Sequence, residues 1–474
     1  MLSSQEERLT AYLESHPQGH ERGAIVLFRR FHLSASEMGD SDRYIAVHVI
    51  PFEDDWVTSS SASHVAFSLK YFRELFRRCD EESLVFGFIH NHPGGPADFS
   101  QTDDVNEETL LAAIRNRNGP QVHFVAMLWS EGIWKARVRS GASSRSVQPA
   151  RHVMVVGQPL KVYLNDVAED EDGFFARQAA AFGHPFVAEL RSLRVAVVGA
   201  GGTGSSVITL LSRAGVGELV IIDGDNLERS NLNRVRGARA SDVGRNKAEI
   251  LKGFVDSLGL SVRTEAIDSF VDLSPLAIDA LATCDVVFGC TDDQIGREVL
   301  NAALYVYAQA YIDVGLGGQV SEDAGGRPYL RYHFGRVSTI LPETGECLFC
   351  QGVLKDAWIR AQYAMRQNAN LTEESARERY LERGGEQAPG VGPFTGAVAD
   401  YGVATLFDLI KPFRRFPPEL RHDAFMIDFV RMQFRSVQEK SDPDCTYCRQ
   451  RAYLLATEQY RLNRPALGKR SEYA

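Results

Sequence analysis

Three side chains near residue 100 have the types and spacing of a metal site. His90 and His92 are two residues apart at the end of a predicted strand, so their imidazoles share one face. A Gly/Pro loop follows, and Ser100 then opens a predicted helix that brings Asp103 back towards the histidines. Ser-x-x-Asp before a helix is more often only an N-terminal cap, but its conjunction with His-x-His favours a metal. Two imidazoles and a carboxylate leave zinc one position for a water of lowered pKa, which predicts hydrolytic chemistry.

A glycine-rich turn marks a second candidate site. The predicted strand 195–198 leads into a G-x-G-x-x-G turn whose glycines are Gly199, Gly201, Gly202 and Gly204. Backbone N–H groups of such a turn, and of the helix that follows, face a phosphate chain. Asp223 ends the next predicted strand, where its carboxylate can accept ribose hydroxyls. Alone, this pattern fits a nicotinamide or flavin dehydrogenase equally well.

Charged residues beyond the turn favour a reaction on a nucleoside triphosphate. Asn231, Arg234 and Lys247 follow the strand that ends at Asp223, and Asp292 comes directly after another strand. Arg and Lys beside a nucleotide neutralise its phosphates, and an aspartate can hold magnesium. This set argues against the NAD-dependent hydride transfer that the glycine turn alone would allow.

Four of the seven cysteines form two Cys-x-x-Cys pairs. Two such pairs on one ion give a closed tetrahedral zinc site with four thiolate ligands, which is structural. They are Cys347 with Cys350 and Cys445 with Cys448. Free cysteines and a metal site fit a reducing compartment better than a disulfide framework does. Of the other cysteines, Cys79 lies in the N-terminal half, while Cys284 and Cys290 flank a predicted buried strand and are expected to fill small apolar positions.

The bulk composition sets limits on the class of protein. With 474 residues the chain is expected to form two or three domains. A formal net charge of -10 argues against a general nucleic-acid or anionic-membrane binder. We find no stretch apolar and long enough to span a membrane and no secretory signal, so we expect a cytoplasmic protein. The acidic run 169–172 marks the expected boundary between domains.

The predicted elements divide at this boundary. Before it we expect helices over 65–78 and 101–115, a buried strand over 83–88, and a hairpin of 122–128 with 134–138. After it we expect strands at 194–198, 219–223, 261–267, 286–290 and 311–314, with helices over 203–213, 246–257 and 294–308. Such alternation predicts an α/β fold with a mainly parallel sheet. The alternating segment 425–437 is expected to add one antiparallel strand.

The residues around His90 resemble the JAB/JAMM (MPN) metallopeptidases, which remove ubiquitin-like modifiers or trim their C-termini. The resemblance implies an α/β peptidase domain with zinc on the two imidazoles and the carboxylate, and Ser100 stabilising the tetrahedral oxyanion. It also implies a general acid/base glutamate upstream, just before a glycine and an apolar strand. Glu21 fits that place, with Glu37 and Glu53 as alternatives.

From about Phe174 to about Tyr453 the chain resembles the ThiF/MoeB/ubiquitin-activating (E1-like) family, with several motifs in the correct order. The resemblance implies a Rossmann-like adenylation domain that uses ATP and Mg²⁺ and carries the four-cysteine zinc site. Asp223 would then bind ribose, and Asp292 would bind magnesium. The phosphates would be contacted by Asn231, Arg234 and Lys247. Arg177 would reach into the partner's site across a homodimer.

The chain departs from this family in one respect. Many ubiquitin-activating enzymes take the modifier as a thioester on a catalytic cysteine, but no cysteine lies between Cys350 and Cys445. The product would then stay an acyl-adenylate or pass to another protein's thiol, unless an oxygen nucleophile such as Thr395 substitutes. The segment 355–384 is charged and helix-prone, and we interpret it as a crossing loop of open role.

Together these features predict two enzymes in one chain. We expect a peptidase domain over 1–165, an adenylyltransferase over 166–460 and a tail over 461–474. Both would act on the C-terminal tail of a ubiquitin-like protein, with an E2-like conjugating enzyme as a further possible partner. The alternatives are a sulfur-carrier system for cofactor synthesis, an NAD-dependent oxidoreductase, and a binding scaffold with a dead peptidase.

Overall fold

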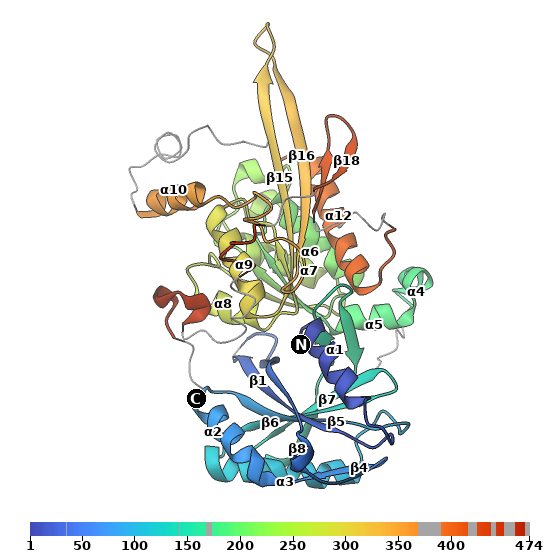
Figure 1. The fold of residues 1–474 in the computed structure, drawn as a ribbon. Helices are drawn as coiled ribbons and strands as arrows, with labels where there is room; N and C mark the ends of the chain where they lie inside the picture. The colour runs from blue at the N-terminus through green and yellow to red at the C-terminus, as the bar shows by residue number, and fades with distance from the viewer. Residues whose placement is uncertain are drawn as a thin grey trace. The chain divides into compact units, whose positions relative to one another are not determined.

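The structure of the protein is a computed structural model. It describes all residues except 35, 142, 167–172, 368–389, 416–423, 438–441, 450–459 and 470–474. The chain divides into two compact units, one of Met1–His32 with Asp42–Phe174 and one of Leu33–Ser41 with Phe175–Arg470 (Figure 1). The acidic run 169–172, where we expect the domain boundary, lies outside the described residues.

A mixed six-stranded sheet, in the order β2-β1-β5-β6-β7-β8, is the centre of the first unit. Its strands are β1 (Gly23–Leu33), β2 (Ser41–Pro51), β5 (Val85–Asn91), β6 (His123–Ser130), β7 (Ile133–Ser140) and β8 (Ser143–Pro149). β5 lies in the middle, antiparallel to β1 and parallel to β6, and all its residues are buried. A strand covered on both faces needs an apolar run rather than alternation, and the sequence supplies one there.

Helices cover both faces of this sheet. Along β1, Ile25 and Leu27 belong to one core, while Ala24 and Val26 belong to the other, as the alternation of a strand requires. The first core also contains side chains of α2 (Arg73–Glu81) and α3 (Gln101–Asn118). The second contains side chains of α1 (Ser3–Leu13). Both cores therefore hold β5 in place, and the first core also holds the middle of α3.

Most of the predicted elements of the first unit are confirmed, with one error. The helix predicted over 65–78 is in fact β4 (His64–Phe67), a 3-10 turn (Leu69–Phe72) and then α2. Val65 and Phe67 pair with β3 (Val57–Ser61), because β-branched and aromatic side chains suit a hairpin as well as a helix. The hairpin of β6 and β7 is confirmed, and a small second sheet joins β9 (His152–Val155) to β10 (Lys161–Leu164).

An eight-stranded sheet, in the order β13-β12-β11-β14-β15-β16-β17-β18, is the centre of the second unit. The parallel part consists of β11 (Arg194–Val198), β12 (Glu218–Ile222), β13 (Arg263–Ile267), β14 (Val286–Gly289) and the start of β15 (Ala310–Glu322). Its helices include α4 (Ala176–Phe182), α5 (His184–Ser192), α6 (Gly202–Ala214), α7 (Lys247–Ser257), α8 (Pro275–Ala282), α9 (Gln294–Val306), α10 (Asp356–Gln367) and α12 (Gly392–Ile410). The predicted α/β class and mainly parallel sheet are confirmed for this unit.

The antiparallel extension of the sheet differs from the prediction. β15 continues well past 314 and pairs with β16 (Pro328–Ile340) in a long hairpin (Figure 1). The glycines and polar residues of 315–325 weaken the apolar pattern that identifies a strand. The single strand predicted over 425–437 is a hairpin of β17 (Ala424–Asp428) and β18 (Gln433–Ser436), with a turn at Met432, whose φ is +53°. Of the segment 355–384, α10 is described and 368–384 lies outside the described residues.

None of the helices in the described parts of the chain is long and apolar enough to cross a membrane.

Candidate active sites

The predicted zinc ligands of the first unit meet at the end of β5. His90 Nε2 lies 3.0 Å from Asp103 Oδ1, and His92 Nε2 lies 3.5 Å from Asp103 Oδ2. The two Nε2 atoms are 3.2 Å apart, and one ligand atom from each of the three residues fits within a span of 4.8 Å. His90 is 1% exposed and Asp103 is 6% exposed. Three potential ligands of zinc therefore converge in a mostly buried place.

The chemistry of these groups fits a cation. His92 Nδ1 lies 3.2 Å from the backbone oxygen of Pro96, so it can donate there and turn the lone pair of Nε2 towards the ion. Burial acts to raise the pKa of Asp103, but hydrogen bonds from His90 and His92 outweigh it and hold that pKa well below its usual range. A zinc ion among the same atoms would likewise favour the ionised carboxylate. The residues present therefore suit a zinc ion with an open position.

Of the three candidate glutamates, Glu21 lies beside the predicted zinc ligands. Its Oε1 is 3.9 Å from His92 Nε2, and the side chain is buried. Gly23 pairs with His90 in the sheet, so the register of β1 and β5 brings Glu21, two residues before Gly23, close to the histidines. Burial raises the pKa of Glu21, which suits a group that both takes and returns a proton. Glu37 belongs to the second unit, where it pairs with Lys252, and Glu53 is exposed.

Ser100 is the N-cap of α3, which is the ordinary role of a Ser-x-x-Asp sequence before a helix. Its Oγ accepts from the backbone N–H of Asp103 at 3.2 Å and donates to Asp103 Oδ2 at 2.8 Å. Both bonds orient the carboxylate of Asp103 towards the histidines. The oxyanion role predicted for Ser100 stays a prediction, because it requires this hydroxyl to turn to a substrate.

Two further residues shape this site and were missed in the sequence. Asn91, which is 4% exposed, accepts from the Arg22 N–H at 2.8 Å and donates to the Leu13 oxygen at 3.0 Å. It thereby ties the segment of Glu21 to β5. Arg137 of β7 contacts the start of α3. The sequence contains a signal for the Arg137 contact, because the alternating cations at positions 135, 137 and 139 are opposite in charge to the acidic residues at the start of α3.

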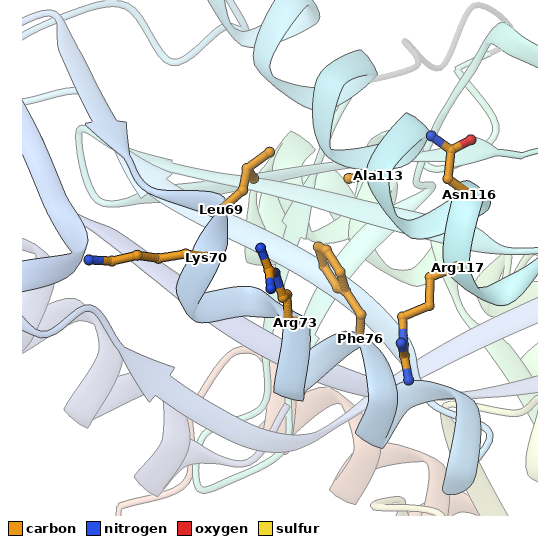
Figure 2. A pocket seen from close by; sticks show the side chains of 7 residues that line it. All are labelled: Leu69, Lys70, Arg73, Phe76, Ala113, Asn116 and Arg117. Atoms are coloured by element: carbon orange, nitrogen blue, oxygen red, sulfur yellow. The ribbon is translucent and has the colours of Figure 1, made fainter.

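A hollow of about 560 Å³ in the first unit is separate from this site (Figure 2). It is lined by residues of the 3-10 turn, of α2 and of the second half of α3, among them Arg73 and Ala113. Ala113 follows Asp103 by ten residues, so the hollow lies about 15 Å along α3 from this predicted zinc ligand. Figure 2 shows only apolar, cationic and amide side chains there, none of which is a metal ligand.

The glycine turn of the second unit joins β11 to α6 and requires glycine at two positions. Gly199 has φ +93°, and a Cβ on it would lie 2.7 Å from the backbone carbon of Cys290. A Cβ on Gly204 would lie 1.8 Å from the Gly199 oxygen. The turn therefore packs tightly against β14 and leaves the first N–H groups of α6 free for a phosphate.

Asp223 follows β12 and closes on the turn. Its Oδ2 accepts from the Ala200 N–H at 2.6 Å, and its Oδ1 accepts from the Asp225 N–H at 2.8 Å. Burial raises its pKa, whereas Lys247 lowers it. In this structure the carboxylate shapes the loop, and the ribose contact predicted for it stays a prediction.

Of the predicted phosphate-binding residues, Arg234 contacts the turn, and Lys247 acts on Asp223 beside it. A Cβ on Gly202 would lie 3.0 Å from Arg234 Cδ, so the stem of this arginine covers the start of α6. Lys247 begins α7, and its Nζ lies 2.8 Å from Asp225 Oδ2. Asn231 is buried, and its Oδ1 accepts from the Glu228 N–H at 3.1 Å. Arg234 is therefore the predicted phosphate-binding residue that contacts the turn directly.

Asp292 and Arg177 are both exposed. Asp292 follows β14, the strand beside the glycine turn, so a magnesium ion could reach it from solvent. Arg177 lies on α4, and within the described parts of the chain it makes no ion pair or hydrogen bond with residues of the turn. Its predicted role in a partner's site stays a prediction.

The four paired cysteines converge as predicted. Cys347 and Cys445 have their sulfurs 3.6 Å apart, as do Cys350 and Cys448, and all four sulfurs fit within 4.8 Å. The buried hydroxyl of Tyr305 has no hydrogen-bond partner among the described residues, and the charges that act on it are those of the four cysteines. Thiolates bound to zinc would accept from it, so the residues fit a structural zinc ion.

None of the three remaining cysteines is an activated nucleophile. Cys79 is buried in the apolar core of the first unit, and Cys284 is fully buried with its thiol donating to the Ala280 oxygen at 3.3 Å. Cys290 is half-buried beside the glycine turn, and burial raises its pKa. A raised pKa keeps the thiol protonated near neutral pH.

The second unit has the fold and the glycine turn of a nucleotide-binding α/β protein. The model of the ThiF family matches residues 175–447, which is more than half of the chain, and the chain belongs to this family.

Several curated relatives match parts of the same region. The SAMP-activating enzyme E1 of Haloferax volcanii is 44% identical over 112 residues, which are 24% of this chain and 41% of that protein. Ubiquitin-like modifier-activating enzyme 5 of Oryza sativa subsp. japonica is 26% identical over 277 residues, covering 56% and 59%. The sulfur carrier protein ThiS adenylyltransferase of Escherichia coli K12 is 33% identical over 135 residues, covering 28% and 53%. The chain spans about half the length of these relatives.

Among solved structures, E. coli MccB in complex with MccA-N7isoASN is similar, with a TM-score of 0.46 and 18% identity. The similarity covers 59% of this chain and 75% of that one.

Proposed function

We propose that the chain is a bifunctional enzyme that acts on the C-terminal tail of a ubiquitin-like protein. The second unit adenylates the tail, and the first unit cleaves a peptide or isopeptide bond beside it. The adenylation activity is supported by membership of the ThiF family and by the glycine turn, which Arg234 contacts. The convergence of Glu21, His90, His92 and Asp103 supports the second.

In the adenylation reaction, the terminal carboxylate of the modifier attacks the α-phosphorus of ATP. A new C–O–P bond forms, the bond to the β-phosphate breaks, and pyrophosphate leaves. Backbone N–H groups of the turn, together with Arg234 and Lys247, balance the phosphate charge. Asp223 holds the ribose, and Asn231 completes the phosphate contacts. Asp292 would hold Mg²⁺, which offsets charge on the departing phosphates.

The acyl-adenylate is then released to a nucleophile of another protein. The chain has no cysteine between Cys350 and Cys445, and Cys290 is protonated near neutral pH. Thr395 is 2% exposed, and its hydroxyl donates to the Gly392 oxygen at 3.0 Å within the first turn of α12. That bond favours a structural role for Thr395. A thiol of an E2-like protein or of a sulfur donor is the acceptor that fits.

In the peptidase reaction, zinc on His90, His92 and Asp103 would polarise the scissile carbonyl and supply a water of lowered pKa. Glu21 takes a proton from that water and delivers it to the leaving nitrogen. The oxygen of the deprotonated water bonds to the carbonyl carbon, and the C–N bond then breaks to give a free carboxylate and a free amine. Ser100 stabilises the oxyanion when its hydroxyl turns from Asp103 to the substrate. A protonated Glu21 is favoured by its burial, so return of the proton is feasible.

A sulfur-carrier pathway is the second candidate. The ThiS adenylyltransferase among the relatives supports it, and the absence of a cysteine between positions 350 and 445 suits transfer to a separate sulfur donor. Incorporation of sulfur into the modifier, rather than its attachment to proteins, would distinguish this pathway from conjugation.

Two assays test the proposal separately. With ATP, Mg²⁺ and a small protein that ends in Gly-Gly from the same genome, we expect exchange of labelled pyrophosphate into ATP, and loss of exchange in Asp292→Ala. With the same protein extended beyond Gly-Gly, we expect cleavage that His92→Ala abolishes while exchange persists. Absence of exchange with every such protein would overturn the first activity, and cleavage by zinc-free His92→Ala would overturn the second.

A further inference from the structure

A cavity of about 260 Å³ adjoins the metal-binding residues of the first unit. It shares His92 as one wall, and the loop between α1 and β1 contributes Glu14 and His16. The end of β6 and the turn after it contribute Trp129 and Glu131. A side chain in this cavity would therefore lie close to the carbonyl held at the zinc site. We call it the side cavity.

The charge of the side cavity is negative. Its lining residues include the carboxylates of Glu14 and Glu131 and no lysine or arginine. The indole Nε1 of Trp129 donates to Glu14 Oε1 at 2.7 Å, which fixes this carboxylate at the wall and leaves its second oxygen available. A bound zinc ion does not reverse this sign, because the carboxylate of Asp103 lies beside it and the carboxylates of Glu14 and Glu131 together offset the rest of its charge.

The His16 and His20 imidazoles of the side cavity contribute flat packing faces rather than positive charge. His16 Nδ1 accepts from the N–H groups of Gln18 and His20, both at 3.2 Å, so the proton of this ring is on Nε2. Burial and the neighbouring His20 lower the pKa of His16, which keeps the ring neutral near pH 7. The rings of His16 and His20 stack with centroids 4.6 Å apart and planes 8° apart. With Trp129 they provide flat faces against which a methylene stem can pack.

We propose that the side cavity binds a lysine or arginine side chain of the polypeptide substrate, next to the scissile bond. The stem packs on the aromatic faces, and the charged end meets Glu14 and Glu131. An acidic side chain would be repelled by both carboxylates, and an apolar one would desolvate them without compensation. The assignment rests on the proposed peptidase activity and names a specificity that this activity would have.

Paired peptides test the assignment. Internally quenched peptides that contain Gly-Gly would differ only in lysine or norleucine at the position before or after it. At one of the two positions, we expect kcat/KM for the lysine peptide to exceed that for the norleucine peptide by about tenfold. This is the size of effect expected from one partly desolvated charge pair. In the double variant Glu14→Gln with Glu131→Gln the ratio should fall to about one, with norleucine turnover retained. Glu7→Gln, an exposed carboxylate of α1, is the matched control and should keep the ratio.

Binding measurements separate this proposal from the peptidase proposal. Calorimetry with the same peptides on zinc-loaded Glu21→Gln protein reports affinity without cleavage. Lysine-selective binding without cleavage by the unmutated enzyme would remove the peptidase activity and keep the cation site. Three results would overturn the cation site: equal affinity for the two peptides, a selectivity that survives the double variant, or no binding of either peptide.

Discussion

Arg137 stacks its guanidinium on the ring of Phe99, with Cζ 4.0 Å from the ring centre, and Phe99 directly precedes the N-cap Ser100. The same guanidinium donates to Glu107 Oε1 at 2.8 Å. The ring of Phe99 in turn lies edge-on to that of His90, with centroids 6.3 Å apart. One side chain of β7 therefore contacts both α3 and the residue before its N-cap, and Phe99 connects it to the ring of a predicted zinc ligand.

Arg137→Gln is expected to weaken zinc binding by about 10–100-fold, the usual effect of losing a partner that orients a metal ligand. Glu107 keeps Arg139 as its ion-pair partner, with Nε 2.7 Å from Oε2, so the fold should survive. Competition with a chromogenic chelator measures the zinc affinity. Arg77→Gln, which removes an exposed arginine of α2, is the control for general destabilisation. Unchanged affinity, or an equal loss in the control, would show that Arg137 does not position the site.

The origin of these contacts explains what could be predicted from sequence. His90, His92, Ser100 and Asp103 lie within one short stretch, so local geometry alone brings them together. Arg137 is more than thirty residues away and reaches them through the pairing of β7 with β6 and of β6 with β5. The alternating cations of β7 are a sequence signal for a charged partner, but the strand pairings that identify this partner have no local signal.

The errors in the predicted elements have similar causes. Val65 and Phe67 fit a helix by spacing, but hairpin pairing with β3 prevailed. β15 was predicted too short because glycines and polar residues interrupt its pattern beyond 314. By contrast, the strands and helices around the glycine turn were predicted well, because each buried parallel strand is an apolar run that ends abruptly.

The stability of the first unit should depend on pH through His123. Its Nδ1 lies 2.8 Å from the hydroxyl of Tyr44, and burial, together with the nearby Arg30, lowers the pKa of His123 to about 4. In the unfolded chain the pKa is about 6.5. Between these values the unfolded state binds the proton more readily, so stability is lost as the pH falls from about 6.5 to about 4. We expect a loss of roughly 2–3 kcal/mol, allowing for partial exposure of the ring.

Urea unfolding at several pH values measures this dependence. In a Trp358→Phe background, the tryptophans that remain all lie in the first unit and report its unfolding alone. His123→Gln keeps an acceptor for Tyr44 and should flatten the pH slope, whereas the exposed His184→Gln should not. The same slope in His123→Gln as in the parent protein would assign the dependence to another group.

Adenylation should depend on the absence of a side chain at Gly204. A Cβ there would lie 1.8 Å from the Gly199 oxygen, so Gly204→Ala must open the turn that faces the phosphates. We expect pyrophosphate exchange to fall by at least about 10²-fold. Gly253→Ala is the matched control, because a Cβ on Gly253 of α7 has no neighbour within 4 Å. It should raise stability by about 0.5–1 kcal/mol and leave exchange intact. Comparable exchange in both variants would contradict a phosphate role for the turn.

Elemental analysis should find about two zinc ions per chain. One would be bound by imidazole and carboxylate ligands and the other by four thiolates. His92→Ala should lose one of them, and Cys448→Ser should lose the other. Tyr305→Phe should keep both ions but release the thiolate-bound zinc faster to a chelator, because the four cysteines lose a buried hydroxyl near them. The phenylalanine ring fills nearly the same volume as the tyrosine ring, so packing changes little. If release from Tyr305→Phe matches that of the unmutated protein, the hydroxyl does not serve the zinc site.

The final prediction concerns the proposed reach of Arg177 into a partner subunit. Arg177 is exposed on α4 and makes no bond to its own glycine turn within the described residues, whereas Asp292 lies beside that turn. Arg177→Ala and Asp292→Ala should each abolish pyrophosphate exchange. In a mixed dimer of the two variants, one site combines an intact Asp292 with an intact Arg177 from the partner.

Co-expression of the two variants with different affinity tags gives these mixed dimers in pure form. We expect about half of the unmutated activity per dimer, because one of its two sites is complete. Arg213→Ala, an exposed arginine of α6, should be fully active alone and serves as the control for the loss of a surface charge. Purified mixed dimers without activity would place Arg177 in its own chain's site. Full activity of Arg177→Ala alone would remove it from catalysis altogether.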